Sequence, residues 1–378
     1  MGKIFIALLT MLCISCNTPD HPGNKVWAWM SGINPMTAAQ WAHIGKNAGN
    51  GCDGANSMTA EQWNYYFKKS SEAGIDAILL ECHGGYPKTP DDTTSFRDSA
   101  AIEIITSALP YAKKYHIELH AWIWTMNRTE MNLRKAHPEW YQINASGESC
   151  LDIKLYNREH YRWLCPSRSE TLNYLKERVA ELAEIEGLAG VHLDFIRYPD
   201  AILPYALHES RHVVQDRVYP LWDFCYCPVC RGRFKALSGM DPLDLEDPTS
   251  NEAWMQYRWD VLSYVAGELC LEIKKHGKTA SVAVFATPEE SKKLVRQDWA
   301  GFKNVDIFFP MIYHKFYGWD DERVLSATKE GVRALKAADT GGYLCSGLFV
   351  GHVPPERLQE FIQYTAEGGS RGICFFSV

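Results

Sequence analysis

Short runs of β-branched and aromatic residues alternate with longer amphipathic segments along almost the whole chain. This alternation is typical of repeated βα units and a parallel sheet. Eight units of this kind predict an α/β fold, a closed (β/α)8 TIM barrel. The expected strands are 26–30, 76–82, 118–125, 189–195, 280–286, 306–313, 343–349 and 372–376. The expected helices are 59–73, 99–115, 169–186, 254–275, 321–338 and 355–368.

The predicted strands fill the chain and leave no segment for a second hydrophobic core. We therefore expect residues 17–378 to form one barrel. Two connections, 31–58 and 199–253, are much longer than the few residues that usually join such elements. Both follow the exit end of a strand, which is the side where barrels of this kind carry their active sites. The long loops are therefore expected to build the walls of a cleft.

Composition separates the candidate functions. The chain is 46% hydrophobic and 22% charged, as expected for a globular protein with a sizeable core. Its formal charge is -7, and the sequence has no basic stripe of the kind that binds phosphate. Nucleic acid is therefore not an expected partner.

The N-terminus has the order of a signal peptide. Lys3 precedes an apolar run at 4–14, and Ser15 and Cys16 follow it. The run is shorter than the roughly 20 residues that span a bilayer. The segment from Cys13 to Cys16 resembles a bacterial lipobox, in which the final cysteine is lipidated. We expect residues 1–16 to be a lipoprotein-type signal peptide, the protein to be exported, and its membrane contact to be an N-terminal lipid anchor.

The fourth predicted strand carries the most informative polar residues. Strict alternation turns His192 and Asp194 toward the barrel interior and Phe195 outward. A carboxylate facing inward loses hydration, so it must be paired, hydrogen-bonded or used. Asp194 is therefore predicted to be the central active-site carboxylate. The alternative is a buried salt bridge from Asp194 to His192, or to Arg197 if the strand has already ended there.

A second carboxylate is expected in the second strand. Alternation turns Glu81 inward near the same rim, whereas a shift of one residue would turn it away. A rim glutamate that pairs with a loop is the structural alternative. Further acidic residues on exit-side loops are Asp152, Asp223, Glu289, Glu290 and Asp320.

Aromatic and polar side chains gather after the third, fourth and sixth strands. Sugar rings stack on aromatic side chains, and Tyr or Trp adds a polar group. Core packing is the alternative for Trp124 and Tyr313, and an inward histidine is commonly just a satisfied polar residue. The predicted substrate-binding residues are His120, Trp122, Trp124, His192, Arg197, Tyr313 and His314.

One group of cysteines is organised in sequence. Cys225, Cys227 and Cys230 place three sulfurs within six residues, a spacing that suits a zinc site or one tight disulfide with a spare thiol. The sequence does not identify a fourth ligand, and no HExxH-like ligand set accompanies the cluster. We therefore expect no catalytic cofactor, and a structural zinc ion remains open.

The sequence also resembles a known group. Gly190-Val-His-Leu-Asp194, followed by Arg197-Tyr-Pro199, is similar to the fourth-strand motif of the family-10-like glycosyl hydrolases, glycosidase-like barrels of exported bacterial proteins. The likeness continues in His120-Ala-Trp-Ile-Trp124, Trp163-Leu-Cys-Pro-Ser167 and Pro310-Met-Ile-Tyr313, and it spans most of the mature chain. Several relatives have Asp-Asp or Asp-Tyr where this chain has Asp194-Phe195, so a mechanism with two carboxylates needs another donor here.

The resemblance implies a glycoside hydrolase that acts on a carbohydrate. Glycoside hydrolysis needs one carboxyl to protonate the leaving oxygen and another to attack the anomeric carbon or activate water. We expect Asp194 to be the nucleophile or base and Glu81 to be the acid. The alternatives are a lyase or transglycosylase on the same kind of polymer, and a surface lipoprotein that binds glycans without turnover.

Overall fold

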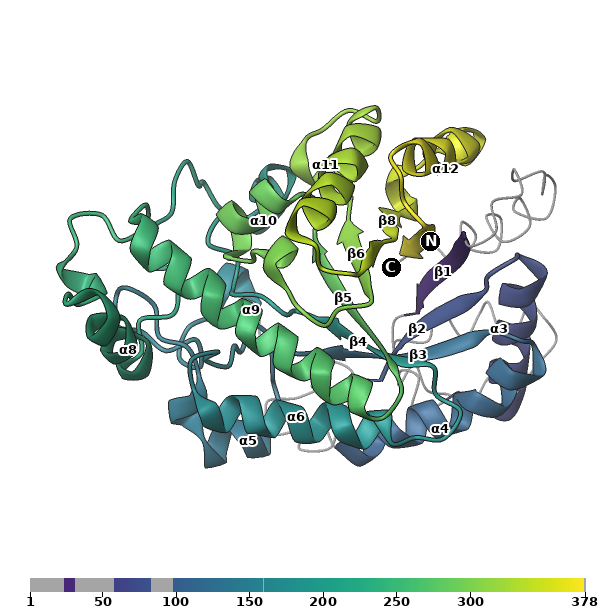
Figure 1. Ribbon diagram of the computed structural model, residues 1–378, viewed down its shortest axis with the longest axis horizontal. Helices are drawn as coiled ribbons and strands as arrows, with labels where there is room; N and C mark the ends of the chain where they lie inside the picture. The colour runs from purple at the N-terminus through teal and green to yellow at the C-terminus, as the bar shows by residue number, and fades with distance from the viewer. Residues whose placement is uncertain (1–23, 31–57, 83–97, 159, 377–378) are drawn as a thin grey trace.

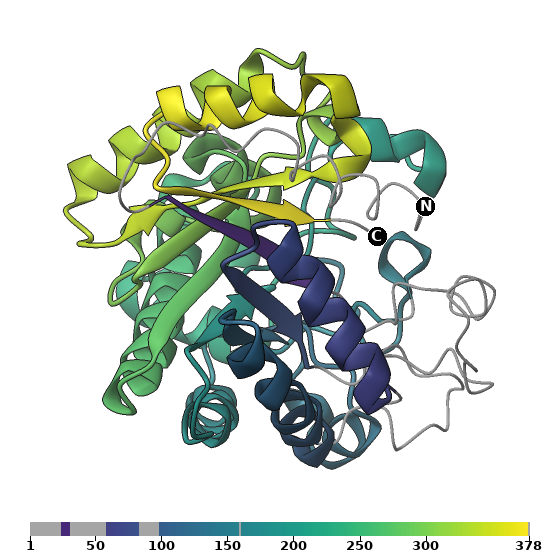
Figure 2. The same ribbon diagram turned by 90° about the vertical axis from the view of Figure 1, so that its right-hand side faces the viewer.

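The protein forms a closed barrel of parallel strands in the computed structural model, which describes residues 24–30, 58–82, 98–158 and 160–376. The first strand pairs with the second and with the last, and the fifth pairs with the sixth, so the sheet has closed on itself (Figures 1 and 2). The (β/α)8 prediction is confirmed. The strands are β1 (Lys25–Met30), β2 (Ala77–Glu81), β3 (Glu118–Trp124), β4 (Gly190–Asp194), β5 (Thr279–Phe285), β6 (Ile307–Met311), β7 (Tyr343–Leu344), β8 (Ser346–Phe349) and β9 (Gly372–Phe376).

All eight predicted strands form, and the seventh is divided in two at Cys345. Both pieces, β7 and β8, pair with β6, and β8 also pairs with β9. The two pieces therefore occupy one position in the barrel wall.

The six predicted helices surround the strands (Figure 1). They are α3 (Ala60–Glu72), α4 (Asp98–Lys114), α6 (Ser169–Ala183), α9 (Glu252–Lys275), α11 (Arg323–Ala338) and α12 (Leu358–Glu367). The predicted start of α3 is confirmed by a capping box, in which Thr59 and Gln62 satisfy each other's backbone N–H groups. Four short helices that were not predicted lie in exit-side loops: α5 (Met131–Ala136), α7 (His208–Arg211), α8 (Pro228–Ser238) and α10 (Pro288–Val295).

The barrel interior is a packed core. It is filled by buried side chains from the inner faces of the strands, among them Trp27, Trp29, Leu79, Trp122 and Phe309. Gly190 is required at its position in β4, because a Cβ atom there would lie 2.4 Å from Nδ1 of His120. The ring of His120, on the neighbouring strand β3, thus occupies the space that a side chain at Gly190 would need.

The predicted alternation of faces holds in β2 and β4. Ile78, Leu80, Val191 and Leu193 pack outward in the layer between strands and helices. Glu81 and Asp194, which alternate with them, both line the cavity at the exit end of the barrel.

Some predictions concern residues outside the described ranges. These are the signal peptide at 1–16 and nearly all of the first long loop, and both stay predictions. Among the described residues, the helices are all too short or too polar to cross a membrane.

Candidate active site

The exit ends of the strands open into a cavity of about 420 Å³. This volume lies within the roughly 300–1,000 Å³ typical of small-molecule sites. Most of its lining is apolar and aromatic, and a few charged groups converge on it. The aromatic side chains include Trp29, Trp122, Trp124, Tyr156, Tyr161, Phe195, Phe285, Tyr313, Phe316, Tyr317 and Phe376.

Asp194 lies in this cavity at the last position of β4, with 8% of its surface exposed. Two N–H groups hold its carboxylate. The indole of Trp122 donates to Oδ2 at 3.1 Å, and the backbone N–H of Phe195 donates to Oδ1 at 2.6 Å. The carboxylate is therefore fixed in orientation while part of it faces the cavity.

Burial raises the pKa of Asp194, because the charged form loses hydration. The Phe195 N–H, the positive charge of Arg197 and the Trp122 N–H act in the opposite direction. A raised pKa brings a carboxyl group closer to the range in which it can exchange protons near neutral pH. This is the electrostatic setting of an acid–base or nucleophilic carboxylate.

The backbone turns sharply directly after Asp194. Phe195 has a left-handed conformation, with φ of 50°, and β4 has already ended. The prediction that Phe195 faces outward in an extended strand is therefore wrong, and its ring lines the cavity 4.8 Å from that of Trp124. The same turn brings Arg197 into the cavity wall, where an extended strand would have pointed it away.

Arg197 is buried among aromatic rings. Its guanidinium lies 4.9 Å from the ring of Trp163 and 5.1 Å from those of Phe195 and Phe285. Among the described residues, it forms its ion pair with Asp200, at 3.3 Å, and not with Asp194. In the described part of the chain, Asp194 is thus held by N–H donors and not by a salt bridge.

Glu81, the predicted second carboxylate, faces the cavity from the end of β2 and is 8% exposed. In the sheet register, Glu81 is level with Trp122, and Trp122 is level with His192. His192 is the inward-facing residue that precedes Asp194 on β4. Two strand spacings, about 10 Å across the sheet, separate the backbones of β2 and β4. Side chains of both residues can therefore reach one bound ligand from neighbouring parts of the wall.

The other predicted carboxylates lie elsewhere. Asp223 is fully buried, with its Oδ1 atom 2.6 Å from Arg258 and 3.2 Å from Arg296, so it is occupied in a structural network. The described cavity lining does not include Asp152, Glu289, Glu290 or Asp320. It does include Asp200, which the sequence did not single out because its partner Arg197 was expected on another face.

His192 lies one layer below the cavity. The indole N–H of Trp29 donates to its Nε2 atom at 3.0 Å, so the proton resides on Nδ1, which lies 2.9 Å from the hydroxyl of Ser281. Burial, and then the neighbouring His120, holds its pKa well below the usual range. His192 is a neutral group that is already fully hydrogen-bonded. The described cavity lining, where it was predicted to contact substrate, does not include it.

The two other predicted histidines also lie outside the described cavity lining. His120 is buried near the N-terminal ends of the strands, against the ring of Trp27 and 3.7 Å from Glu118. His314 follows β6 but turns away from the cavity, and its Nε2 atom lies 3.1 Å from Asp321. Both positions favour structural roles.

Three predicted aromatic residues, Trp122, Trp124 and Tyr313, do line the cavity. Tyr313 stacks on Phe376 with ring centres 5.7 Å apart. Burial raises the pKa of Tyr313 well above its usual value, and the charges of Cys374 and Asp194 add to the effect. Tyr313 therefore keeps its proton and can donate a hydrogen bond near Asp194.

Sequence reasoning missed several residues of the cavity. Trp29 and Phe376 lie at the exit ends of β1 and β9, where the alternation used for β2 and β4 would have found them. Arg158 and His160 come from a loop and Arg211 from the short helix α7, and none of the three carries a periodic signal. Burial lowers the pKa of His160 to about 4, and the charges of Arg158 and Arg162 add to this, so the imidazole is neutral near neutral pH.

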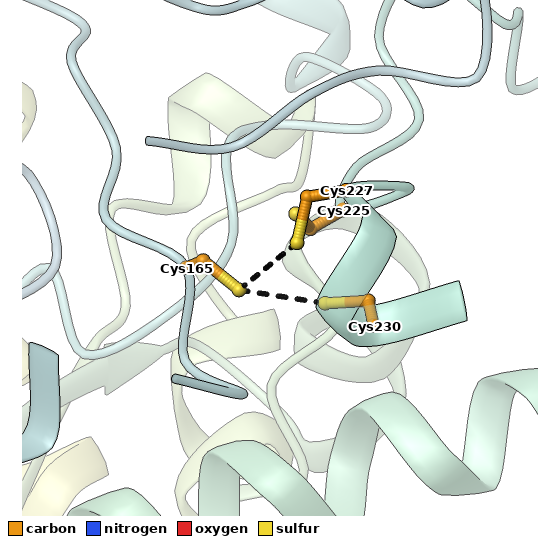
Figure 3. Close-up of side chains that lie close together, drawn as sticks. All are labelled: Cys165, Cys225, Cys227 and Cys230. Carbon is orange, nitrogen blue, oxygen red and sulfur yellow. Dashed lines mark hydrogen bonds between the residues drawn. The ribbon is translucent and has the colours of Figure 1, made fainter. Parts of the chain in front are cut away.

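The cysteine cluster lies outside the described cavity lining. Cys225, Cys227 and Cys230 meet a fourth cysteine, Cys165, which comes from the loop that follows β3 (Figure 3). The sulfur of Cys165 lies 3.5 Å from those of Cys227 and Cys230. Sequence spacing could not have found this fourth member, because a separation of 60 residues from Cys225 carries no signal of contact.

No protein-family model and no curated protein match this sequence. Solved structures are similar in fold. The glycoside hydrolase domain of PgaB (BpsB) from Bordetella bronchiseptica aligns with a TM-score of 0.56 and 12% identity, over 83% of this chain and 87% of its own. Alpha-L-fucosidase isoenzyme 2 from Paenibacillus thiaminolyticus has a TM-score of 0.56 and 12% identity, over 95% of this chain and 46% of its own. The beta-galactosidase from Rahnella sp. R3 has a TM-score of 0.55 and 10% identity, over 95% of this chain and 51% of its own.

These likenesses show that the chain shares its barrel fold with these three proteins. At 10–12% identity they show the fold alone. This chain spans about half the length of the fucosidase and galactosidase chains that it matches.

Proposed function

We propose that this protein is a glycoside hydrolase whose central carboxylate is Asp194. The observation that carries the proposal is the setting of this one group. Asp194 ends the fourth strand of the barrel, is nearly buried, has a raised pKa, and faces an aromatic cavity while two N–H groups fix its orientation. An inward carboxylate without an ion pair among the described residues is costly to keep, and catalysis is a reason to keep it.

In this proposal Asp194 attacks the anomeric carbon of the sugar or activates a water molecule. The Trp122 and Phe195 N–H groups would stabilise its ionised form before the reaction. Glu81 would protonate the leaving oxygen, because it places a second carboxylate in the lining of the same cavity. Tyr313, protonated and beside Asp194, would donate to a hydroxyl of the sugar.

The cavity walls suit a carbohydrate. Trp124, Phe195 and Tyr313 present aromatic surfaces on which the C–H faces of a sugar ring can stack. Arg158 and Arg211 add positive charge to the lining, and a carboxylate-bearing sugar would match it. Export through residues 1–16, with a lipid anchor at Cys16, would place such an enzyme where it meets extracellular polysaccharide.

A panel of plant, host and peptidoglycan-derived glycans tests the proposal, with uronic-acid polymers included. Each glycan is incubated with the wild type, with Asp194→Asn, and with Asp152→Asn as an exposed control outside the described cavity lining. Products are separated by mass. We expect cleavage by the wild type and the control and none by Asp194→Asn. Binding of a glycan by the wild type without any cleavage would instead indicate a glycan-binding lipoprotein.

A further inference from the structure

Four buried cysteines converge at one point of the structure, and the proposed catalysis uses none of them. Cys165, Cys225, Cys227 and Cys230 each expose 1% or less of their surface. Their sulfur atoms all lie within 4.8 Å of one another. The other described cysteines form no comparable group of three or more metal-binding side chains. Packing a thiol as a small hydrophobe does not require four of them to meet.

The spacing of the sulfurs is that of a metal site. Four sulfurs at about 2.3 Å from a tetrahedral zinc ion lie about 3.8 Å from one another. The contacts of Cys165 with Cys227 and Cys230 are both 3.5 Å. A disulfide would bring two sulfurs to about 2.05 Å, far closer than these pairs. Figure 3 shows Cys165 facing the other three from the opposite side.

We propose that Cys165, Cys225, Cys227 and Cys230 bind one zinc ion as a structural tetrathiolate site. Each thiol gives up its proton to solvent when the metal binds, since the thiolate is the ligand. All four tetrahedral positions are then filled by protein, which leaves none for a substrate or water. This closed ligand set is the reason for a structural rather than a catalytic role.

The backbone on both sides of the cluster is already fixed. The N–H of Cys165 donates to the carbonyl of Trp140 at 2.7 Å, and its carbonyl accepts from the hydroxyl of Thr171 at 2.6 Å. On the other side, the N–H of Tyr226 donates to the carbonyl of Ile143 at 2.7 Å. Little ordering would therefore accompany metal binding, which favours high affinity.

The surroundings suit negative charge on the sulfurs. Cys227 caps helix α8, so the positive end of the helix dipole lies at the site. The hydroxyl of Ser167 lies 3.1 Å from the sulfur of Cys230, so it can donate a hydrogen bond to a thiolate there.

The metal would join two exit-side loops. Cys165 belongs to the segment between β3 and α6, and the other three belong to the long connection between β4 and α9. The same two segments carry Tyr161 and Arg197, which line the cavity. Zinc would thus support the cavity wall without touching the substrate. This inference rests on the sulfurs and stands whether or not the protein cleaves glycans.

Metal content is the first test. The full-length protein is purified without chelator, and its zinc is measured by elemental analysis before and after a mercurial reagent blocks the thiols. We expect one zinc per chain, released as the thiols react. Reconstitution of the metal-free protein with cobalt should give the visible bands of tetrahedral cobalt bound by four thiolates. A protein purified with free, metal-less thiols or with disulfides among the four would overturn the proposal, as would a cobalt spectrum of oxygen or nitrogen ligands.

Cysteine variants provide the second test. Cys165→Ala removes one ligand, whereas Cys150→Ala removes a buried cysteine of the same loop that lies outside the cluster. We expect at least a hundredfold loss of zinc affinity and a lower melting temperature for Cys165→Ala, with full zinc content for Cys150→Ala. Equal zinc loss in both variants, or in neither, would refute the assignment. If Cys165→Ala does not fold, the zinc and cobalt measurements on the wild type decide.

Discussion

Asp194→Asn separates a catalytic carboxylate from a structural one, because the two roles predict opposite changes in stability and activity. The substitution preserves shape but removes the charge. Asp194 accepts two hydrogen bonds, from Trp122 and from the Phe195 backbone. Asparagine offers one oxygen, so one of the two N–H donors loses its acceptor.

The expected change in stability is the difference between two terms. A buried donor left without an acceptor costs about 1–3 kcal/mol. Against this, the substitution removes a charge whose burial raises the pKa of Asp194. Because the folded pKa is higher than the unfolded one, the folded state binds more protons between the two values, and stability falls as pH rises through that window. The neutral amide escapes this loss, so we expect a net change within about 1 kcal/mol at neutral pH, roughly 2 °C in melting temperature.

A salt-bridged aspartate would behave differently. Removing one partner of a buried ion pair costs about 3–5 kcal/mol, and its stabilising effect is lost at low pH. The ion pair of Arg197 with Asp200 argues against this case. A second signature follows from the raised pKa of Asp194. Relative to the wild type, the folded variant should be least stable at acidic pH, where Asp194 is protonated anyway. It should be most stable, relative to the wild type, above the pKa of Asp194.

Turnover is measured on the same samples. Loss of a general acid or base typically lowers the rate by about 10²–10⁴-fold, and loss of a nucleophile lowers it at least as much. We expect Asp194→Asn to lose this much activity per folded molecule while its melting curve barely moves. A variant that melts early and keeps its activity per folded molecule would show that Asp194 is part of the scaffold and would refute the reasoning.

Three further predictions concern the cavity and the cysteine site. Trp122→Phe removes an N–H donor that lowers the pKa of Asp194, so this pKa should rise further. On the acidic side of the pH profile, kcat/KM should then fall by about tenfold to a hundredfold. An unchanged acidic limb would contradict this. Glu81→Gln should depress cleavage of substrates with poor leaving groups far more than cleavage of activated aryl glycosides, whose leaving groups need no protonation. The control Asp200→Asn, beside Arg197, should affect both kinds of substrate alike. Equal effects of Glu81→Gln on both would show that Glu81 is not the acid. Activity should survive EDTA, because the cysteine site is structural and buried; turnover lost by a still-folded protein would indicate a catalytic metal.

Periodicity explains which parts of this protein could be predicted from sequence. The strands were found because buried parallel strands read as short apolar runs, and Asp194 and Glu81 interrupt such runs at inward positions. Alternation then assigned their faces without knowledge of the neighbouring strands. The closed barrel follows from the number of units, since eight βα units close on themselves.

What the sequence did not predict depends on contacts between distant segments or on backbone turns. Cys165 meets Cys227 only because the loops after β3 and β4 lie against each other. His314 follows β6 at a position that alternation cannot assign, because the chain has by then entered a 3-10 turn, and it faces Asp321. His192 was correctly placed inside the barrel, but its two hydrogen-bond partners come from β1 and β5.

The turn at Phe195 connects these features. A bulky residue in the left-handed region is disfavoured by about 1–2 kcal/mol. Here the turn supplies the backbone N–H that holds Asp194. The ring of Phe195 contacts Trp124 and the guanidinium of Arg197. An extended residue at this position would point Arg197 away from the cavity. The position of the carboxylate and the position of the cation therefore both depend on where β4 ends.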